Sequence, residues 1–477
     1  MSLARLSAGS GYKYLLKHTA CGDCGRDAGT SLTSYYAESG YPAGRWLGSG
    51  LAGLNGGRGL AAGSTVTEEA MAALYGRGHD PISGAALGRA FPVYRSAEER
   101  IADAVGRLPD ALASTERQAA VEAIETRERA RPVKAAVAGF DLTFTAPKSA
   151  SVLWALGDRE VQQAVADAHR EAVTAVLALI EDRFLHTRVG ANSCAQVATR
   201  GMIAAAFDHW DTRTGDPNLH THVVIANKVQ GPDGRWRSLD GQAVYRAAVA
   251  CSETYDALVA DALSARLSVT WGLRDRGDRR NPAFEIVGVE EALLALFSSR
   301  AGQIEGQLRG LVTGFTAKHG REPSRREMLR LRQQATLASR PDKTVAPLAT
   351  LFTRWRTQAT ELTGRLPAAL VADAQPVVTV PVATAPVASA PLASASSIAA
   401  PATAVSGFSS VRAVDMPEDI VEQAACTALA AVAERRSTWT RNNLLAEAAR
   451  ATRLVRVSGP QERIALLDRV VDTAIGG

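Results

Sequence analysis

The sequence predicts an α+β fold in which antiparallel strands pack with helices. A β-rich run at 219–227, LHTHVVIAN, follows a second apolar run at 201–210, and the letters DTRTGDPN between them form a turn signal. The tight turn GPDGRW then returns the chain for another short strand, which extends the hairpin into an antiparallel meander. Helical patterns at 159–185 and 247–267 come before and after these strands.

Composition limits the class of protein. The chain has 477 residues, enough for about two to four domains, and 46% of them are hydrophobic. It contains no apolar run long enough to cross a membrane and no secretory signal peptide, so we expect a soluble, cytoplasmic protein. Five cysteines do not make a disulfide framework at this size. A net charge of +5 is compatible with a nucleic-acid partner but does not establish one.

The first 50 residues are rich in tyrosine. Five of the nine tyrosines lie there, and four of them form the two groups YKY and SYY. A phenolate can act as a nucleophile and hold a covalent intermediate, whereas the alternative interpretation is ordinary core packing. The five residues are Tyr12, Tyr14, Tyr35, Tyr36 and Tyr41.

The same segment places His18, Cys21 and Cys24 at a spacing typical of metal ligands. A structural zinc site usually has four ligands, and no second cysteine pair is present, so we expect a loop with a spare thiol pair instead. Residues 67–95 predict a short helix followed by a loop. Residues 96–131 are charged and rich in alanine, which predicts a surface helix.

The next strand is predicted at 137–144, where apolar residues dominate. Pro147 ends the pairing, and Ser149 can cap the helix that follows. Asp141 is a charge within this apolar strand. It either lies on a solvent-facing side of the strand or points into a site, where a carboxylate can orient a histidine or accept a proton.

Three of the eight histidines lie in the central hairpin. Side chains alternate along a strand, so His220 and His222 point to the same side. The hairpin brings His209 onto that face. Three converging imidazoles are typical of a metal site, whereas the alternative is a set of separate polar residues near a turn.

Beyond the meander the chain changes character twice. Residues 289–365 are helical and rich in arginine, and they form either a grip on a phosphate backbone or a solvated helix face. Residues 366–415 consist mostly of Ala, Pro, Val, Thr and Ser, which predicts a flexible linker. From Met416 the sequence is helical again.

Two blocks resemble a known family. GFDLTFTAPKSAS at 139–151, together with FDHWDTRTGDPNLHTHVVIANKV at 207–229, is similar to the relaxase domain of TrwC/TraI-type conjugative proteins, the MobF class. SYYAESGYPAGRWLGSGLAGL at 34–54 resembles the N-terminal tyrosine region of that family. The resemblance covers about residues 1–365 and implies a central antiparallel β-sheet flanked by helices, as in HUH relaxases and rolling-circle initiators, with a C-terminal helical extension.

The resemblance also implies roles for the residues of the strands. His209, His220 and His222 match the three metal ligands of the family. Asp141 matches the motif aspartate that supports the histidines and takes part in proton transfer.

The tyrosines correspond to two pairs in the family. Tyr35 and Tyr36 match the second pair. The first pair is interrupted here by Lys13, in GYKYLL, where the family often has two adjacent tyrosines. Tyr14 is favoured as the first nucleophile because leucine follows it, and Tyr12 is the alternative.

The implied function is that of a conjugative relaxase. Such a protein nicks single-stranded DNA at an origin of transfer through a metal-assisted tyrosine, with Mg²⁺ or Mn²⁺ as the expected cation and Zn²⁺ as an alternative. The expected partners are single-stranded and hairpin DNA, relaxosome accessory proteins and a type IV secretion coupling protein. Competing hypotheses are a plasmid or phage replication initiator, a non-catalytic DNA-binding regulator, and a zinc hydrolase that uses the three histidines and water.

The resemblance further implies three parts. These are a relaxase domain at 1–365, a linker at 366–415, and a helical segment at 416–477 that resembles the start of a truncated helicase region. The sequence has no GxxxxGK[ST] pattern, so we expect no helicase activity from these residues.

Overall fold

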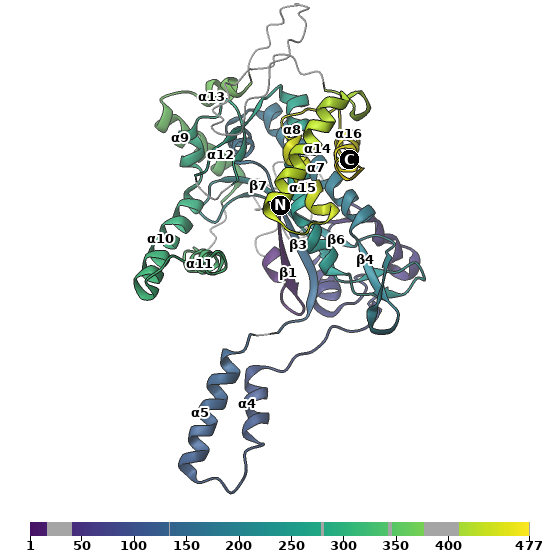
Figure 1. The fold of residues 1–477 in the computed structure, drawn as a ribbon, viewed down its shortest axis with the longest axis vertical. Coiled ribbons are helices and arrows are strands. Elements are labelled where there is room, and N and C mark those ends of the chain that lie inside the picture. The colour runs from purple at the N-terminus through teal and green to yellow at the C-terminus, as the bar shows by residue number, and fades with distance from the viewer. Residues whose placement is uncertain (17–40, 133, 278–280, 342–345, 376–409, 477) are drawn as a thin grey trace, which may run out of the picture.

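The centre of the computed structural model is a five-stranded antiparallel sheet flanked by helices, which confirms the predicted fold class (Figure 1). The structure describes residues 1–16, 41–132, 134–277, 281–341, 346–375 and 410–476. The sheet has the strand order β1-β3-β7-β6-β2. Its strands are β1 (Ser2–Ser7), β2 (Arg45–Leu47), β3 (Val137–Thr145), β6 (Ala204–Asp211) and β7 (Pro217–Ala226).

The central hairpin is formed by β6 and β7, as the turn signal predicts. His209 lies directly opposite His220, and Phe207 lies opposite His222. Gly215, in the turn, has a φ of 77°, a backbone conformation that favours glycine. The other side of β7 pairs with β3, so the strand with two of the histidines is held on both edges.

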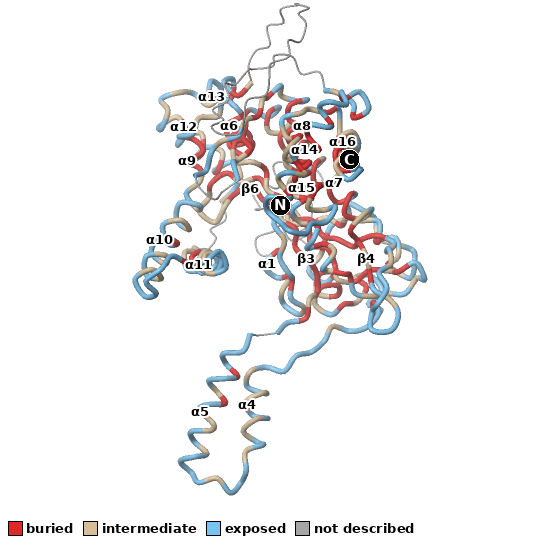
Figure 2. The backbone as a smooth tube through the Cα atoms, in the orientation of Figure 1, coloured by how far each residue is buried: buried red, intermediate tan, exposed pale blue. Residues whose placement is uncertain are grey.

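The two faces of the sheet have separate cores because the side chains of each strand alternate. One face packs against the long helices α7 (Arg159–Arg183) and α8 (Gly241–Leu267) and includes Phe144 and Val223. The opposite face has a smaller core with Phe207, which α3 and Tyr75 help to cover. Figure 2 shows that buried residues are concentrated in the sheet and in the helices that pack against it.

Shorter elements complete the body of the molecule. Three two-stranded sheets comprise β4 (His186–Val189) with β5 (Ala195–Ala198), β8 (Val229–Gln230) with β9 (Trp236–Arg237), and β10 (Trp271–Arg274) with β11 (Ala283–Ile286). The remaining α-helices before the C-terminal segment are α1 (Lys13–Leu16), α3 (Glu68–Met71), α4 (Ala97–Val105), α5 (Ser114–Ala130), α6 (Lys148–Leu156), α9 (Glu291–Leu296), α10 (Ser299–His319), α11 (Arg325–Ala338), α12 (Leu348–Thr363) and α13 (Pro367–Ala374). The short η elements are η1 (Ser49–Gly53), η2 (Asn55–Gly57), η3 (Ala72–Arg77), η4 (Ala191–Ser193) and η5 (Ala413–Asp415).

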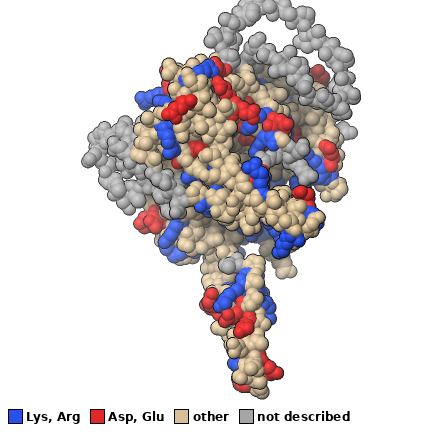
Figure 3. All heavy atoms as spheres, turned by 90° about the vertical axis from the view of Figure 1, so that its left-hand side faces the viewer, with Lys and Arg blue, Asp and Glu red and all other residues tan. Residues whose placement is uncertain are grey.

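The surface helix expected at 96–131 is two helices, α4 and α5, which form an arm that projects from the body (Figure 1). Only Ile124 and Glu128 are buried within these two helices. Acidic and basic side chains are mixed along the arm (Figure 3), and several pair with one another, as Arg100 does with Glu128 at 3.1 Å. The arm therefore presents no surface of a single charge.

The C-terminal helices pack on the body of the protein. Helices α14 (Glu418–Arg435), α15 (Arg441–Ala451) and α16 (Pro460–Gly476) form a group whose members α15 and α16 contact α8. The fully buried Arg463 forms two hydrogen bonds of 2.7 Å with the carboxylate of Asp261 on α8. A buried pair of this kind is costly to break from one side, so it holds α16 in one position.

The predicted linker begins with a helix. α13 lies within the first part of 366–415 and buries Leu370, Val371 and Ala374. Residues 376–409 are outside the described part of the chain. Among the described helices, none has the length and apolar character that crossing a bilayer requires.

Candidate metal centre

Three histidines converge on one face of the sheet, as the hairpin predicts. Each of His209, His220 and His222 offers a ring nitrogen, and these nitrogens all lie within 4.8 Å of one another. The ring centroids are 5.2 to 5.3 Å apart, so the imidazoles surround a common point. Imidazole nitrogen is a ligand that suits divalent transition metals, and the donor set fits a single cation.

Two of the histidines are oriented by hydrogen bonds at Nδ1. His222 Nδ1 lies 3.0 Å from both carboxylate oxygens of Asp141 and 3.3 Å from the hydroxyl of Thr143. His220 Nδ1 lies 2.7 Å from the carbonyl oxygen of Asn218. An imidazole that donates from Nδ1 presents Nε2 as the lone pair for a metal ion, which is the usual function of such outer partners.

Tyr14 reaches this centre through Asp141. Its hydroxyl donates a hydrogen bond to Asp141, and its ring centroid is 6.2 Å from that of His222. The chain leaves β1 and turns back through Gly9, with a φ of 81°, which directs α1 towards the same strands. Tyr14, Asp141 and His222 therefore form one hydrogen-bonded series beside the centre.

The environment of Tyr14 keeps its phenol protonated. Burial of the hydroxyl end, reinforced by the negative charge of Asp141, raises the pKa of Tyr14 far above its ordinary value of 10.0. The rest of the side chain remains accessible, with 47% of the residue surface exposed. A protonated phenol requires a base before it can act as a nucleophile, and the carboxylate that accepts its hydrogen bond is in position to act as one.

The remaining residues that the sequence predicts for a site do not contact the histidine centre or lie outside the described part of the chain. Tyr12 is buried in the smaller core, with 5% of its surface exposed, so of the first pair only Tyr14 is hydrogen-bonded to Asp141. Tyr35 and Tyr36 lie outside the described residues, as do three further candidates, His18, Cys21 and Cys24.

Tyr41 and Asp211 also belong to the centre, although the sequence did not single them out for it. The Tyr41 ring is 4.3 Å from that of His209, and its hydroxyl donates to the carboxylate of Asp211. Burial, followed by the charge of Asp211, raises the pKa of Tyr41 well above its usual range. No local pattern identifies this pair, because a β-bulge between His209 and Asp211 interrupts the alternation of side chains along β6.

A buried polar network lies on the opposite face of β7. Thr221, between the two metal-facing histidines, donates to Asp208 at 2.6 Å and is 2.8 Å from Nε2 of His169 on α7. His169 Nδ1 is 2.6 Å from the hydroxyl of Tyr255 on α8. Because Thr221 has one proton and gives it to Asp208, His169 Nε2–H is the donor to Thr221, and His169 Nδ1 accepts from Tyr255. The strand of the ligands is thereby attached to both long helices.

This network predicts a loss of stability at acid pH. Burial lowers the pKa of His169 from 6.5 to about 4, so the unfolded chain binds a proton more readily than the folded one. The contribution of neutral His169 to the free energy of unfolding is complete above pH 6.5. It is lost as the pH falls towards 4, and the total loss is about 3 kcal/mol. Urea unfolding at a series of pH values should show this decline in the wild type and a smaller one in His169→Gln, which keeps a donor and an acceptor. Equal declines would contradict the assignment.

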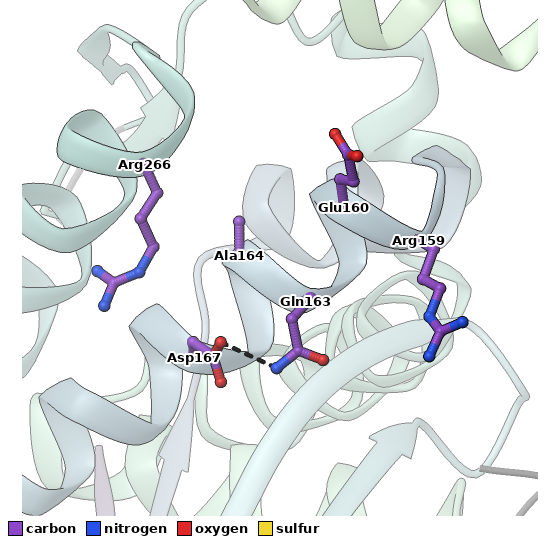
Figure 4. A pocket seen from close by; sticks show the side chains of 6 residues that line it. All are labelled: Arg159, Glu160, Gln163, Ala164, Asp167 and Arg266. Carbon is purple, nitrogen blue, oxygen red and sulfur yellow. Dashed lines mark hydrogen bonds between the residues drawn. The ribbon is translucent and has the colours of Figure 1, made fainter. Parts of the chain in front are cut away.

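Another hollow lies on the outer surface of α7 and α8, away from these groups. Arg159, Glu160, Gln163, Asp167 and Arg266 line it together with one alanine (Figure 4). Its volume is about 540 Å³, and its charges are of both signs. None of the residues of the histidine centre contributes to it, so it is not the site that the sequence predicts.

The antiparallel sheet and the three-histidine centre together define an HUH-type metal site. Residues 8–362 match the TrwC relaxase family, and because the match covers most of the chain, the protein belongs to that family.

Curated relatives match a shorter part of the chain than the family does. The chain is 36% identical over 140 residues to the multifunctional conjugation protein TraI of Escherichia coli, and 35% identical to that of strain K12. The match covers 29% of this chain and 7% of either relative.

Two solved structures of the conjugative relaxase TrwC are also similar. One is a metal-bound complex with oriT DNA, with a TM-score of 0.49 and 23% identity over 76% of this chain and 98% of that one. The other is a complex with a 27-mer DNA comprising the recognition hairpin and the cleavage site, with a TM-score of 0.46 and 22% identity over the same shares.

Proposed function

We propose that this protein is a conjugative relaxase that nicks one DNA strand at an origin of transfer and remains attached to the 5′-phosphate through tyrosine. The observation that carries the proposal is the series formed by the hydroxyl of Tyr14, the carboxylate of Asp141 and the ring of His222 beside the three-histidine centre. Membership of the TrwC relaxase family supports the same activity.

The reaction follows from these groups. Asp141 accepts the proton of Tyr14, and Tyr14 Oη attacks the phosphorus of the scissile phosphodiester. The bond from phosphorus to the 3′-oxygen breaks, which releases a 3′-hydroxyl after protonation and leaves a phosphotyrosine ester. A divalent cation held by His209, His220 and His222 would draw charge from the non-bridging oxygens. Because no water is consumed, the reverse reaction can rejoin the strand.

The proposal also covers the second tyrosine pair, the cation, the DNA and protein partners, and the extent of the relaxase domain. Tyr35 and Tyr36 provide a second nucleophile that cleaves again when transfer ends. The cation is Mg²⁺ or Mn²⁺, with Zn²⁺ as an alternative. The DNA is single-stranded at the nick and forms a hairpin nearby, and relaxosome accessory proteins and a type IV coupling protein are the expected protein partners. The relaxase domain is expected at 1–365 with the linker from 366, where α13 packs against α6, and no helicase activity is expected from these residues.

The function of Asp141 gives a separate prediction. Asp141→Asn keeps an acceptor for the Tyr14 hydroxyl but cannot take its proton, so the rate of adduct formation should fall by about 10²-fold. Thr143→Val is the matched control, because it removes only the longer 3.3 Å contact to the same nitrogen of His222 and should leave the rate close to that of the wild type. An unchanged rate in Asp141→Asn would exclude the carboxylate as the base.

The experiment that tests the function uses labelled single-stranded oligonucleotides from the DNA that neighbours the gene. Each is incubated with the protein, with and without divalent cations, and the products are separated on a denaturing gel. A relaxase produces a labelled band that is covalently attached to protein and sensitive to protease. A hydrolase that uses water would produce a free 5′-phosphate, and a regulator would leave the oligonucleotide intact.

A further inference from the structure

A large groove lies between two pairs of helices outside the metal centre. Helices α10 and α11 supply one set of lining residues, α14 and α15 supply another, and Val249 of α8 also contributes. The volume of the groove is about 1700 Å³. None of the groups that surround the three histidines lines it, so it is a separate feature of the surface.

The lining of the groove is strongly basic. Seven arginines and two glutamates contribute to it, which gives a net charge of +5. The seven, called the groove arginines below, are Arg276, Arg309, Arg325, Arg332, Arg435, Arg436 and Arg450.

Only three of the groove arginines are neutralised. Arg332 lies 3.5 Å from Glu305, while Arg435 and Arg450 lie 3.1 and 2.5 Å from Glu447. The other four are exposed, and their side chains form no hydrogen bond or ion pair with any residue in the described ranges. These four are Arg276, Arg309, Arg325 and Arg436. Guanidinium groups in this state are available to bind phosphate oxygens through paired N–H donors.

Apolar side chains lie between the basic ones. Leu308, Val312, Met328, Leu329 and Val432 all line the groove, and 64% of Leu329 is exposed. Single-stranded nucleic acid presents phosphates and unpaired bases along one chain, so it can satisfy both kinds of surface at once. An acidic peptide would match the charge but would leave the apolar side chains without an equivalent partner.

Helix α10 connects this groove to the hairpin that carries the metal ligands. The hydroxyl of Ser299 donates to the Asp216 carboxylate at 2.7 Å, and the backbone N–H of Arg300 donates to it at 3.3 Å. Asp216 lies in the turn between β6 and β7. From Ser299 to Arg309 the helix rises by about 15 Å, which a stacked strand covers in about four to five nucleotides at ~3.4 Å each.

We propose that this groove is a second binding site for single-stranded DNA, which holds the strand by its phosphates on one side of the metal centre. The inference extends the proposed function, because it assigns a path to the part of the strand that is not at the scissile phosphate. It also gives the C-terminal helices α14 and α15 a direct contact with DNA.

The test uses the full chain and a fluorescent oligothymidylate of about 30 nucleotides, a sequence-neutral strand of the kind that such grooves bind. The variants are Arg309→Gln with Arg325→Gln on one wall, Arg436→Gln on the other, and the triple combination. Arg326→Gln with Arg330→Gln is the matched control, because both residues are exposed on α11 and do not line the groove. Binding is measured by fluorescence anisotropy over a series of KCl concentrations, after circular dichroism has shown that each variant is folded.

The triple variant should bind at least about tenfold more weakly at low salt, and its plot of log affinity against log salt should be shallower by about 2, or ~0.7 for each lost phosphate contact. Variants of either wall should show part of this loss, and the control should match the wild type. If only the variants of one wall bound more weakly, or if the control lost as much affinity as the triple variant, the proposal would be overturned. Polyglutamate serves as a second probe. If the triple variant lost affinity for polyglutamate but bound oligothymidylate as the wild type does, the groove would instead bind an acidic peptide, and the proposal would be overturned. The probe need not be cleaved, so this result is independent of the adduct assay.

Discussion

Tyr14→Phe is expected to reduce formation of the covalent protein–DNA adduct by about 10³-fold or more, because the variant lacks the oxygen that we propose to attack phosphorus. The ring and its contact with His222 remain, so binding of the oligonucleotide should change little. The measurement is the protease-sensitive band on a denaturing gel, quantified at early times. It is made in a background with Tyr35→Phe and Tyr36→Phe, so that the second pair cannot replace the first.

Tyr12→Phe provides the control for this experiment. Tyr12 is buried in the smaller core, and its loss of one hydroxyl should leave the adduct rate nearly unchanged. Adduct formation that survives in Tyr14→Phe but disappears in Tyr12→Phe would show that α1 moves when DNA binds and that Tyr12 is the nucleophile. Survival of the adduct in both would mean that no tyrosine of this pair reacts.

His220→Ala should remove metal binding and nicking together. Loss of one of three imidazole ligands is expected to weaken the affinity for Mn²⁺ by more than the ~10- to 100-fold that loss of an outer partner costs. Isothermal titration calorimetry measures the affinity, and the adduct assay measures the activity of the same preparation. Because His220 is not fully buried, the fold should survive the change.

The matched control is His319→Ala, since His319 is exposed on α10 and outside the centre. It should bind Mn²⁺ and form the adduct as the wild type does. If His220→Ala cleaves DNA at full rate and EDTA has no effect on that cleavage, the three histidines do not hold a catalytic metal.

Local patterns were sufficient to predict the hairpin and the convergence of His209, His220 and His222. Both follow from a turn signal and from the alternation of side chains along a strand, which depend on neighbours in the sequence. The charged Asp141 in an apolar strand could be noticed for the same reason, but the pattern alone left two interpretations. Its contacts with His222 and Tyr14 decide between them in favour of the site.

Long-range packing explains what could not be predicted. The difference between Tyr12 and Tyr14 depends on how the chain turns after β1, and the attachment of His169 to Thr221 joins residues 52 positions apart. Tyr41 and Asp211 are separated by 170 positions. The paired helices of the arm and helix α13 also differ from the sequence expectation, because composition describes solvent exposure better than it describes where a helix begins.

All three ligands lie on one hairpin, with His209 directly opposite His220. A slip of β7 by a single residue against its neighbours would turn both of its imidazoles to the opposite side of the sheet and place Thr221 where they had been. Metal uptake thus reports on strand alignment as well as on the presence of the ligands. A folding intermediate with misaligned strands would be unable to capture the ion, so loading with metal would select the correctly paired molecules.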